Sequence, residues 1–363
     1  MFFLGVISET ILYLCFSILM GSFILYAVPE RYRPSIYVPR NVMLLATGGI
    51  AILSFTPVAI LVLYLYKDIG IWNTLQSVLF TFEVGKAWVI TYFIATFLFI
   101  FIVWFDIRKR ALFSFIGIAF TLVLILALGY ASHASSYDPI TGFLTHSTHF
   151  TAVTVWVGIL FVVGWKSTNY ANWLSFLKWY TPLSILCLSV TILSGLYLMN
   201  FVIDYEFYTN SWMLTYGQTL LLKHILVLPL LAYAFINGIF IKNTLRKQSA
   251  FDPRPWTKAE GIIIGFIFAA TAALGQQSPP HETDITKDTV STLFTYFYQG
   301  KYTENMVLGL EMSLTSVLLL ICATTFFALM IYSFMKKAGP LLTFILGVFL
   351  TISSYLTILV SIQ

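Results

Sequence analysis

The sequence predicts an all-α fold, a polytopic transmembrane bundle of about ten helices. Hydrophobic residues make up 59% of the chain and charged residues only 10%, whereas a soluble domain carries about 25% charged residues. Long apolar runs recur along the whole chain, and the connections between them are short. No stretch is long or polar enough to fold as a separate soluble domain. We therefore expect the lipid bilayer to surround most of the chain, and nothing favours nucleic acid as a partner.

Each apolar run is long enough to cross about 30 Å of hydrocarbon, which takes roughly 20 helical residues. The expected spans cover residues 4–28, 42–66, 84–105, 111–131, 144–165, 179–203, 216–241, 258–276, 305–333 and 340–360. The first run starts almost at Met1, without a basic stretch before it or a small-residue cleavage site after it. We expect it to be a retained helix rather than a signal peptide.

Lysine and arginine gather in alternate connections, and this pattern predicts the orientation of the helices. The basic connections hold Arg31, Arg33, Arg40, Arg108, Lys109, Arg110, Lys166, Lys178, Lys242, Arg246, Lys247, Arg254, Lys258, Lys336 and Lys337. Because cytoplasmic loops carry an excess of basic residues, we expect a multi-pass membrane protein with both termini outside. Most acidic residues then lie outside, where they attract cations, although the basic bias alone also leaves them there.

All five histidines map to the outer side in this topology. His133 ends the fourth span, and His146 and His149 open the fifth. His224 lies about two turns inside the seventh span, and His281 follows the eighth. Imidazole is the commonest metal ligand in proteins, so this grouping favours a metal site. His281, in a polar loop, is more simply explained as a surface residue.

His146 and His149 are three residues apart, which places both side chains on one face of a helix about one turn apart. The connection from His133 is short, about a dozen residues with turn signals, so His133 can approach the pair. Three imidazoles suit Cu(II) or Zn(II), and fewer imidazoles suit Cu(I). The residues alone do not distinguish between these ions. Met199 and Met213, near the outer end of the sixth span, would add soft thioethers that favour Cu(I).

Among the ionisable residues inside predicted spans, three stand out, namely Glu9, Lys223 and His224. Such residues are costly in hydrocarbon and usually functional. Lys223 is expected to reach the interface or to pair with Glu9. His224 is expected to ligate either a metal ion or a haem iron.

The three cysteines, Cys15, Cys187 and Cys322, stand singly in apolar runs, so the spacing indicates neither a disulfide framework nor a zinc knuckle. Sulfur ligands near the middle of the membrane suit Cu(I), which makes Cys15 and Cys187 candidates for a relay. The alternative is that they are small buried hydrophobic residues, as free cysteines usually are.

The segment Thr148–Leu160 reads Thr-His-Phe-Thr-Ala-Val-Thr-Val-Trp-Val-Gly-Ile-Leu. With His149, Trp156 and Gly158 it resembles the H-x6-W-x-G-x-L signature of the copper-resistance D (CopD) membrane family. Further landmarks agree in the same order: His133-Ala134, Ser194-Gly195, Tyr216-Gly217, Lys223, Asn237, Glu260 and Pro279-Pro280. The resemblance implies an eight-helix CopD-like membrane domain over residues 1–280, followed by an outer loop at 281–304 and two additional helices at 305–363.

The resemblance also implies a role in moving copper across the cytoplasmic membrane, and an extracytoplasmic copper-binding protein as the donor. The first hypothesis is therefore a copper permease, with uptake as the expected direction, copper as the only cofactor and no enzymatic activity. A second hypothesis is a membrane haem b protein in which two of His133, His149 and His224 ligate one iron, which leaves a redox role open. A third is a copper sensor or a copper or oxidase assembly factor. An absorption spectrum separates haem from copper.

Overall fold

The computed structural model describes residues 1–248, 250–283, 285–286, 288–298 and 306–362. The chain divides into two compact units, unit 1 at Met1–Phe201 and unit 2 at Val202–Gln363. Among the described residues, 10 helices are long and apolar enough to cross a membrane. The predicted all-α polytopic bundle is confirmed, and each of the ten helical spans overlaps a predicted apolar run. The ninth helix begins at Leu314 and not at residue 305.

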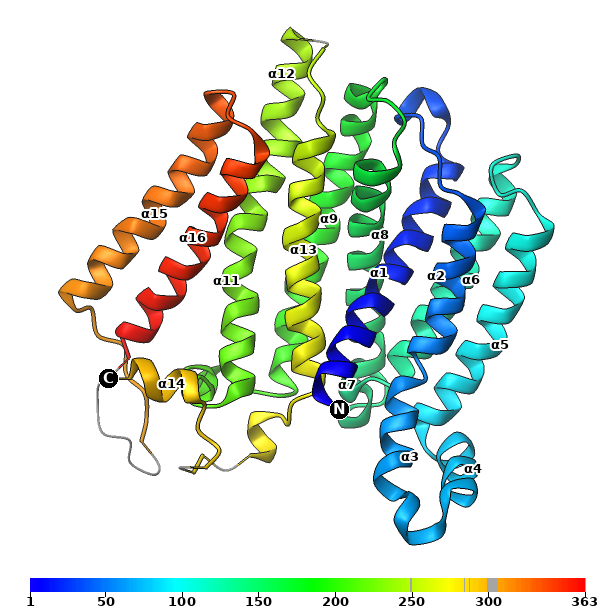
Figure 1. The fold of residues 1–363 in the computed structure, drawn as a ribbon, viewed down its shortest axis with the longest axis vertical. Helices are drawn as coiled ribbons and strands as arrows, with labels where there is room; N and C mark the ends of the chain where they lie inside the picture. The colour runs from blue at the N-terminus through cyan, green and yellow to red at the C-terminus, as the bar shows by residue number, and fades with distance from the viewer. Residues whose placement is uncertain (249, 284, 287, 299–305, 363) are drawn as a thin grey trace. The chain divides into compact units, whose positions relative to one another are not determined.

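Unit 1 contains six of these spans together with short surface helices (Figure 1). Its helices are α1 (Phe2–Ala27), η1 (Glu30–Tyr32), α2 (Arg40–Leu53), α3 (Thr56–Ile69), α4 (Ile71–Thr81), α5 (Glu83–Trp104), α6 (Ala111–Tyr130), α7 (His133–Tyr137), α8 (Thr141–Lys166) and α9 (Trp173–Asn200). Helices α2 and α3 form one broken span. The break comes just before Pro57, because the proline ring clashes with the preceding helical turn and lacks an N–H donor.

Helix α8 packs against α1, α6 and α9 within unit 1. Its closest approach is to α1, where Gly158 meets Gly21 and the backbone carbonyl of Ser17. A Cβ atom on Gly158 would lie 2.2 Å from the Ser17 oxygen, and one on Gly21 would lie 2.0 Å from the Gly158 oxygen. Small residues let membrane helices pack backbone to backbone. The glycine of the signature segment therefore has a structural role, to seat α8 against α1.

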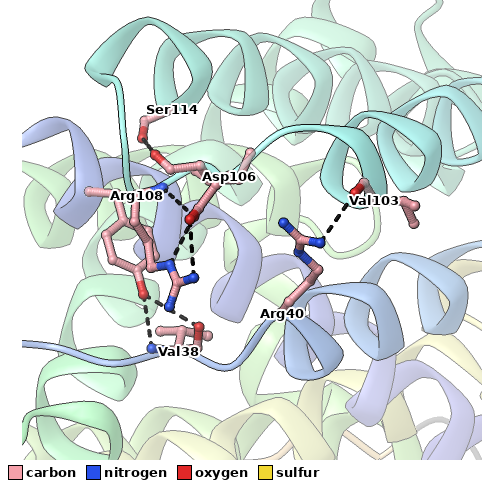
Figure 2. Close-up of polar contacts among 8 residues, drawn as sticks. Val38, Arg40, Val103, Asp106, Arg108 and Ser114 are labelled. Atoms are coloured by element: carbon pink, nitrogen blue, oxygen red, sulfur yellow. Dashed lines mark hydrogen bonds and ion pairs between the residues drawn. The ribbon is translucent and has the colours of Figure 1, made fainter.

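The connections at the basic end of unit 1 are tied together by polar contacts (Figure 2). The Arg108 guanidinium donates to Asp106, with Nε 2.9 Å from Oδ1 and an Nη nitrogen 3.2 Å from Oδ2. Arg40 donates to the Val103 carbonyl at 3.3 Å, which joins the start of α2 to the end of α5. The Arg108 guanidinium lowers the pKa of Asp106. Basic residues here therefore hold the loops as well as biasing topology.

Unit 2 contains the other four spans. Its elements are η2 (Tyr205–Phe207), α10 (Tyr208–Ser211), α11 (Thr215–Phe235), the π-helical segment η3 (Ile236–Phe240), α12 (Ile241–Lys247), α13 (Arg254–Gly275), η4 (Pro280–Glu282), α14 (Thr292–Phe297), α15 (Leu314–Met335) and α16 (Pro340–Val360). Helix α16 packs against α15, α11 and α13. The two helices expected after residue 304 are thus present as α15 and α16. Of the predicted outer loop, residues 284, 287 and 299–304 lie outside the described residues.

The direction of the chain reverses at each span, so the loops alternate between the two ends of each unit. In unit 1 the N-terminus, α7 and the first turn of α8 lie at one end, and the Asp106–Arg110 connection lies at the other (Figure 1). In unit 2 the start of α11 shares an end with α14, and the α12–α13 connection lies at the opposite end. In each unit the basic connections are therefore gathered at the end away from the histidines.

Candidate metal-binding residues

His149 lies in the first third of α8, against α9. Its Nδ1 atom is 3.0 Å from the Ser194 hydroxyl oxygen, and that hydroxyl donates to the Val190 carbonyl at 2.5 Å. Because the Ser194 proton is used in this bond, the oxygen accepts from His149, which places the ring proton on Nδ1. The lone pair then lies on Nε2. Proteins orient a metal-ligating histidine by such a hydrogen bond to the ring nitrogen that does not bind the metal.

Gly195 provides the space that the His149 ring occupies. A Cβ atom at this position would lie 3.3 Å from Cε1 of His149, closer than a relaxed contact. The Ser194-Gly195 pair therefore forms the surface of α9 against which the His149 imidazole packs. Met199, a predicted ligand, follows Gly195 by four residues on the last turn of α9 and is half-buried.

His146 lies one turn before His149 on the same helix, confirming that α8 carries both side chains. Its Nδ1 atom is buried and has no hydrogen-bond partner among the described residues. The ring stacks against Phe150 at a centroid distance of 6.4 Å. A buried polar atom normally has a partner, so this nitrogen fits a ligand position. A metal ion would supply the missing interaction.

His133 and Glu83 line one open cavity of about 390 Å³ at the histidine end of unit 1. The cavity is lined by Thr81, Phe82, Glu83, Val84, Ala131, Ser132, His133 and Ser136. His133 is exposed and is close enough to His146 for an electrostatic interaction. Glu83 was not selected from the sequence, where its signal is only an acid just before the third predicted span. Carboxylate and imidazole together suit capture of a cation.

Glu9 lies on α1, and the structure shows it accepting a hydrogen bond from the Tyr13 hydroxyl one turn further along. The Tyr13 ring packs against Phe150 with centroids 5.4 Å apart, and Phe150 in turn stacks on His146. Glu9 is therefore connected to the His146 ring through the side chains of Tyr13 and Phe150. The predicted pairing of Glu9 with Lys223 joins residues of different units and stays a prediction.

The cysteines have different surroundings. Cys15 is buried on α1, and a Cβ atom on Gly49 of α2 would lie 2.8 Å from its sulfur, so the thiol fills the contact between these helices. Cys187 is buried on α9, seven residues before Ser194, which places it on the same helical face about two turns deeper. Cys322 is exposed on α15. The two relay candidates thus lie on different helix pairs.

His224 in unit 2 is held by a tyrosine. Its Nδ1 atom is 2.6 Å from the Tyr208 hydroxyl, and burial raises the pKa of Tyr208. Lys223 is the next residue and interacts electrostatically with the imidazole. An ammonium group beside the ring repels a metal cation. His281 is exposed, with Nδ1 2.9 Å from the Val202 carbonyl, as expected of a surface histidine.

Within the ranges that the structure describes, no three His, Cys, Asp or Glu side chains come close enough to hold one metal ion. His133, His146 and His149 are therefore gathered at one end of unit 1 without forming a closed three-ligand site.

The ten membrane-length helices define a multi-pass membrane protein. Residues 174–274, from α9 to α13, match the family model for copper resistance protein D. Over this segment the match supports the resemblance to the CopD family that the landmarks predict. The match includes Ser194-Gly195, Asn237 and Glu260, whereas the signature segment Thr148–Leu160 precedes it. No curated protein and no solved structure matches the chain.

Proposed function

We propose that this protein is a copper permease of the bacterial cytoplasmic membrane that takes up copper through histidine ligands at the outer end of α8. The observation that carries the proposal is the His146–His149 pair. One ring has a buried nitrogen without a hydrogen-bond partner in the described chain, and the other has its tautomer set by Ser194. Two adjacent imidazoles oriented in this way suit a copper ion.

Capture begins in the open cavity that His133 and Glu83 share. A carboxylate and an imidazole at the rim attract a cation and bind it weakly enough to pass it on. An extracytoplasmic copper-binding protein is the expected donor, and this cavity is wide enough for a ligand side chain of that donor to enter.

The path inward follows the face of α9 that holds His149. Thr191, one turn deeper than Ser194, has a buried hydroxyl oxygen without a hydrogen-bond partner in the part of the chain described. Cys187 lies about one further turn inward on the same face. A hydroxyl and a thiol in sequence suit transient contacts with Cu(I). Because α8 and α9 pack along each other, copper passes between these two helices.

Copper uptake into proteoliposomes tests this function. We expect wild type to fill the vesicles with Cu(I) and Cys187→Ser to slow uptake at least tenfold with outer-site binding intact. Cys322→Ser is the matched control, because that thiol is exposed on α15, and it should not change the rate. Absence of uptake by wild type that binds copper would contradict the permease. A Soret band in the purified protein would instead indicate the haem alternative.

A further inference from the structure

A buried carboxyl group lies in unit 2, at the end of the four spans that carries the basic connections. Glu260 on α13 is only 2% exposed. The Asn237 amide nitrogen donates to its Oε2 atom at 2.6 Å and to the Trp256 carbonyl at 3.3 Å. Glu260 lies six residues after the start of α13, about 9 Å along the helix axis. It is therefore close to the α12–α13 connection.

The carboxyl group lacks the partners that a buried charge requires. Neither of its oxygens pairs with a basic side chain in the described ranges. Both amide hydrogens of Asn237 are used in the two bonds above, and its Oδ1 atom is buried with no hydrogen-bond partner in those ranges. One amide bond does not compensate an ionised carboxylate in an apolar interior. The buried Glu260 carboxyl group avoids this cost only when it carries a proton and is neutral.

Among the described residues, the groups near Glu260 supply no competing charge. On α11, Tyr233 is within electrostatic reach of Glu260, but its hydroxyl donates to the Pro340 carbonyl at 2.8 Å. On α13 itself, Lys258 is exposed and Arg254 pairs with Asp252 at 2.7 Å. Helix α16 also packs against α13, and the first turn of α16, Pro340–Thr343, carries no titratable side chain. Proton uptake is thus the way in which this carboxyl group is neutralised.

The position of Asn237 is set by an irregular helical turn. It lies in η3, the π-helical segment between α11 and α12, where one extra residue per turn shifts the register of the side chains. Such segments are rare and frequently mark functional sites. Here the shifted turn carries the amide that contacts α13.

We propose that Glu260 and Asn237 form a proton-binding site. The Glu260 carboxyl takes a proton from the side of the α12–α13 connection, and loss of this proton leaves a carboxylate that the Asn237 amide holds in place. If the proposed transport function holds, this proton leaves toward the opposite side of the membrane as a copper ion moves inward, so that the two cations are exchanged. The proton-binding site itself does not depend on that function.

Labelling with an apolar carbodiimide tests the site without copper. The reagent adds to a protonated carboxyl group: the proton moves to a carbodiimide nitrogen, and a carboxyl oxygen bonds to the central carbon. We expect mass spectrometry to find the adduct on Glu260, with severalfold less labelling as the pH rises. Exposed Glu311 serves as the internal reference. Labelling of Glu260 that is independent of pH, or no greater than that of Glu311, would overturn the proposal.

Proton movement in proteoliposomes provides the second test, with a pH-sensitive dye inside the vesicles. Copper uptake by wild type should make the lumen more alkaline. The Glu260→Gln variant, which keeps the shape and the contact with Asn237, should lose this signal, and Glu311→Gln should keep it. Equal signals in wild type and Glu260→Gln would overturn proton exchange. Glu260 labelling that falls with rising pH in a wild type without copper uptake would leave the proton site standing and contradict the permease.

Discussion

Helices α8 and α11 both carry imidazoles inside a membrane span, but their neighbours give these imidazoles different chemistry. On α8, His146 has a buried nitrogen without a partner in the described chain, and His149 is oriented by Ser194. On α11, His224 is bound to Tyr208 at 2.6 Å and lies beside the ammonium of Lys223. The first pair suits a cation, and the second position repels one. We therefore expect the neighbouring groups, and not the mere presence of an imidazole in a span, to decide which histidine binds a metal ion.

The two helices also differ in how they pack against their neighbours. Helix α8 approaches α1 backbone to backbone at Gly21 and Gly158, so the part of α8 that follows its histidines is held by a rigid contact. The start of α11 is covered instead by side chains, in a cluster that includes Trp212, Met213, Leu221 and Ile225. Met213, considered from the sequence as a thioether ligand, is 1% exposed within that cluster. Its side chain packs in the core of unit 2.

The largest effect on stability should come from disrupting the close contact between α8 and α1. Gly158→Ala places a Cβ atom 2.2 Å from the Ser17 carbonyl oxygen, where only a backbone shift relieves the clash. We expect a loss of about 3 kcal/mol or more in the free energy of unfolding, since overpacking is costly in a tight interface. Thermal unfolding in detergent measures it. Gly48→Ala, with nothing within 4 Å of the added atom, is the control, and equal unfolding temperatures would refute the close crossing.

Removing the imidazoles tests the comparison directly. The His146→Ala, His149→Ala double variant should bind Cu(I) at least a hundredfold more weakly than wild type, about 2.7 kcal/mol. His224→Ala should leave the affinity within about threefold of wild type, because Lys223 already disfavours a cation there. Titration against a competing Cu(I) chelator measures both. A larger loss in His224→Ala than in the double variant would reverse the assignment of the two helices.

A smaller effect is expected from the hydroxyl that orients His149. Ser194→Ala removes the acceptor for Nδ1–H, so the ring loses its fixed tautomer. Changes in such outer partners typically cost 10-fold or more in metal affinity, about 1.4 kcal/mol. Tyr208→Phe is the matched change beside His224 and should not alter copper binding. The same competition titration measures both, and unchanged affinity in Ser194→Ala would remove the role proposed for the serine.

The smallest effect concerns a solvent-facing pair, in contrast with the buried sites. Arg108 lowers the pKa of Asp106, so the pair stabilises the fold above the unfolded pKa of about 3.9. This stabilisation is lost as the pH falls through the lower pKa of the folded protein. Asp106→Asn should cost less than about 1 kcal/mol at neutral pH and should weaken the acid dependence of the unfolding temperature. A larger acid dependence in the variant would contradict the sign.

The sequence by itself determined the all-α membrane fold, the ten spans and the alternation of basic connections. These properties are local, because the length of an apolar run and the charges of the loops beside it do not depend on distant residues. The placement of His146 and His149 on one helical face was also predictable, since helical spacing alone decides it. The family landmarks could also be recognised in the sequence, but the contact that each of them makes could not be predicted.

Only the tertiary structure decided which landmarks meet. Ser194 and Gly195 are far along the chain from His149, and their contact depends on how α8 packs against α9. The Asn237–Glu260 hydrogen bond likewise depends on a π-helical turn that no composition or spacing indicates. Distances between side chains on different helices follow from packing angles and helix register. These are properties of whole interfaces, so the residues that form each site had to be read from the folded chain.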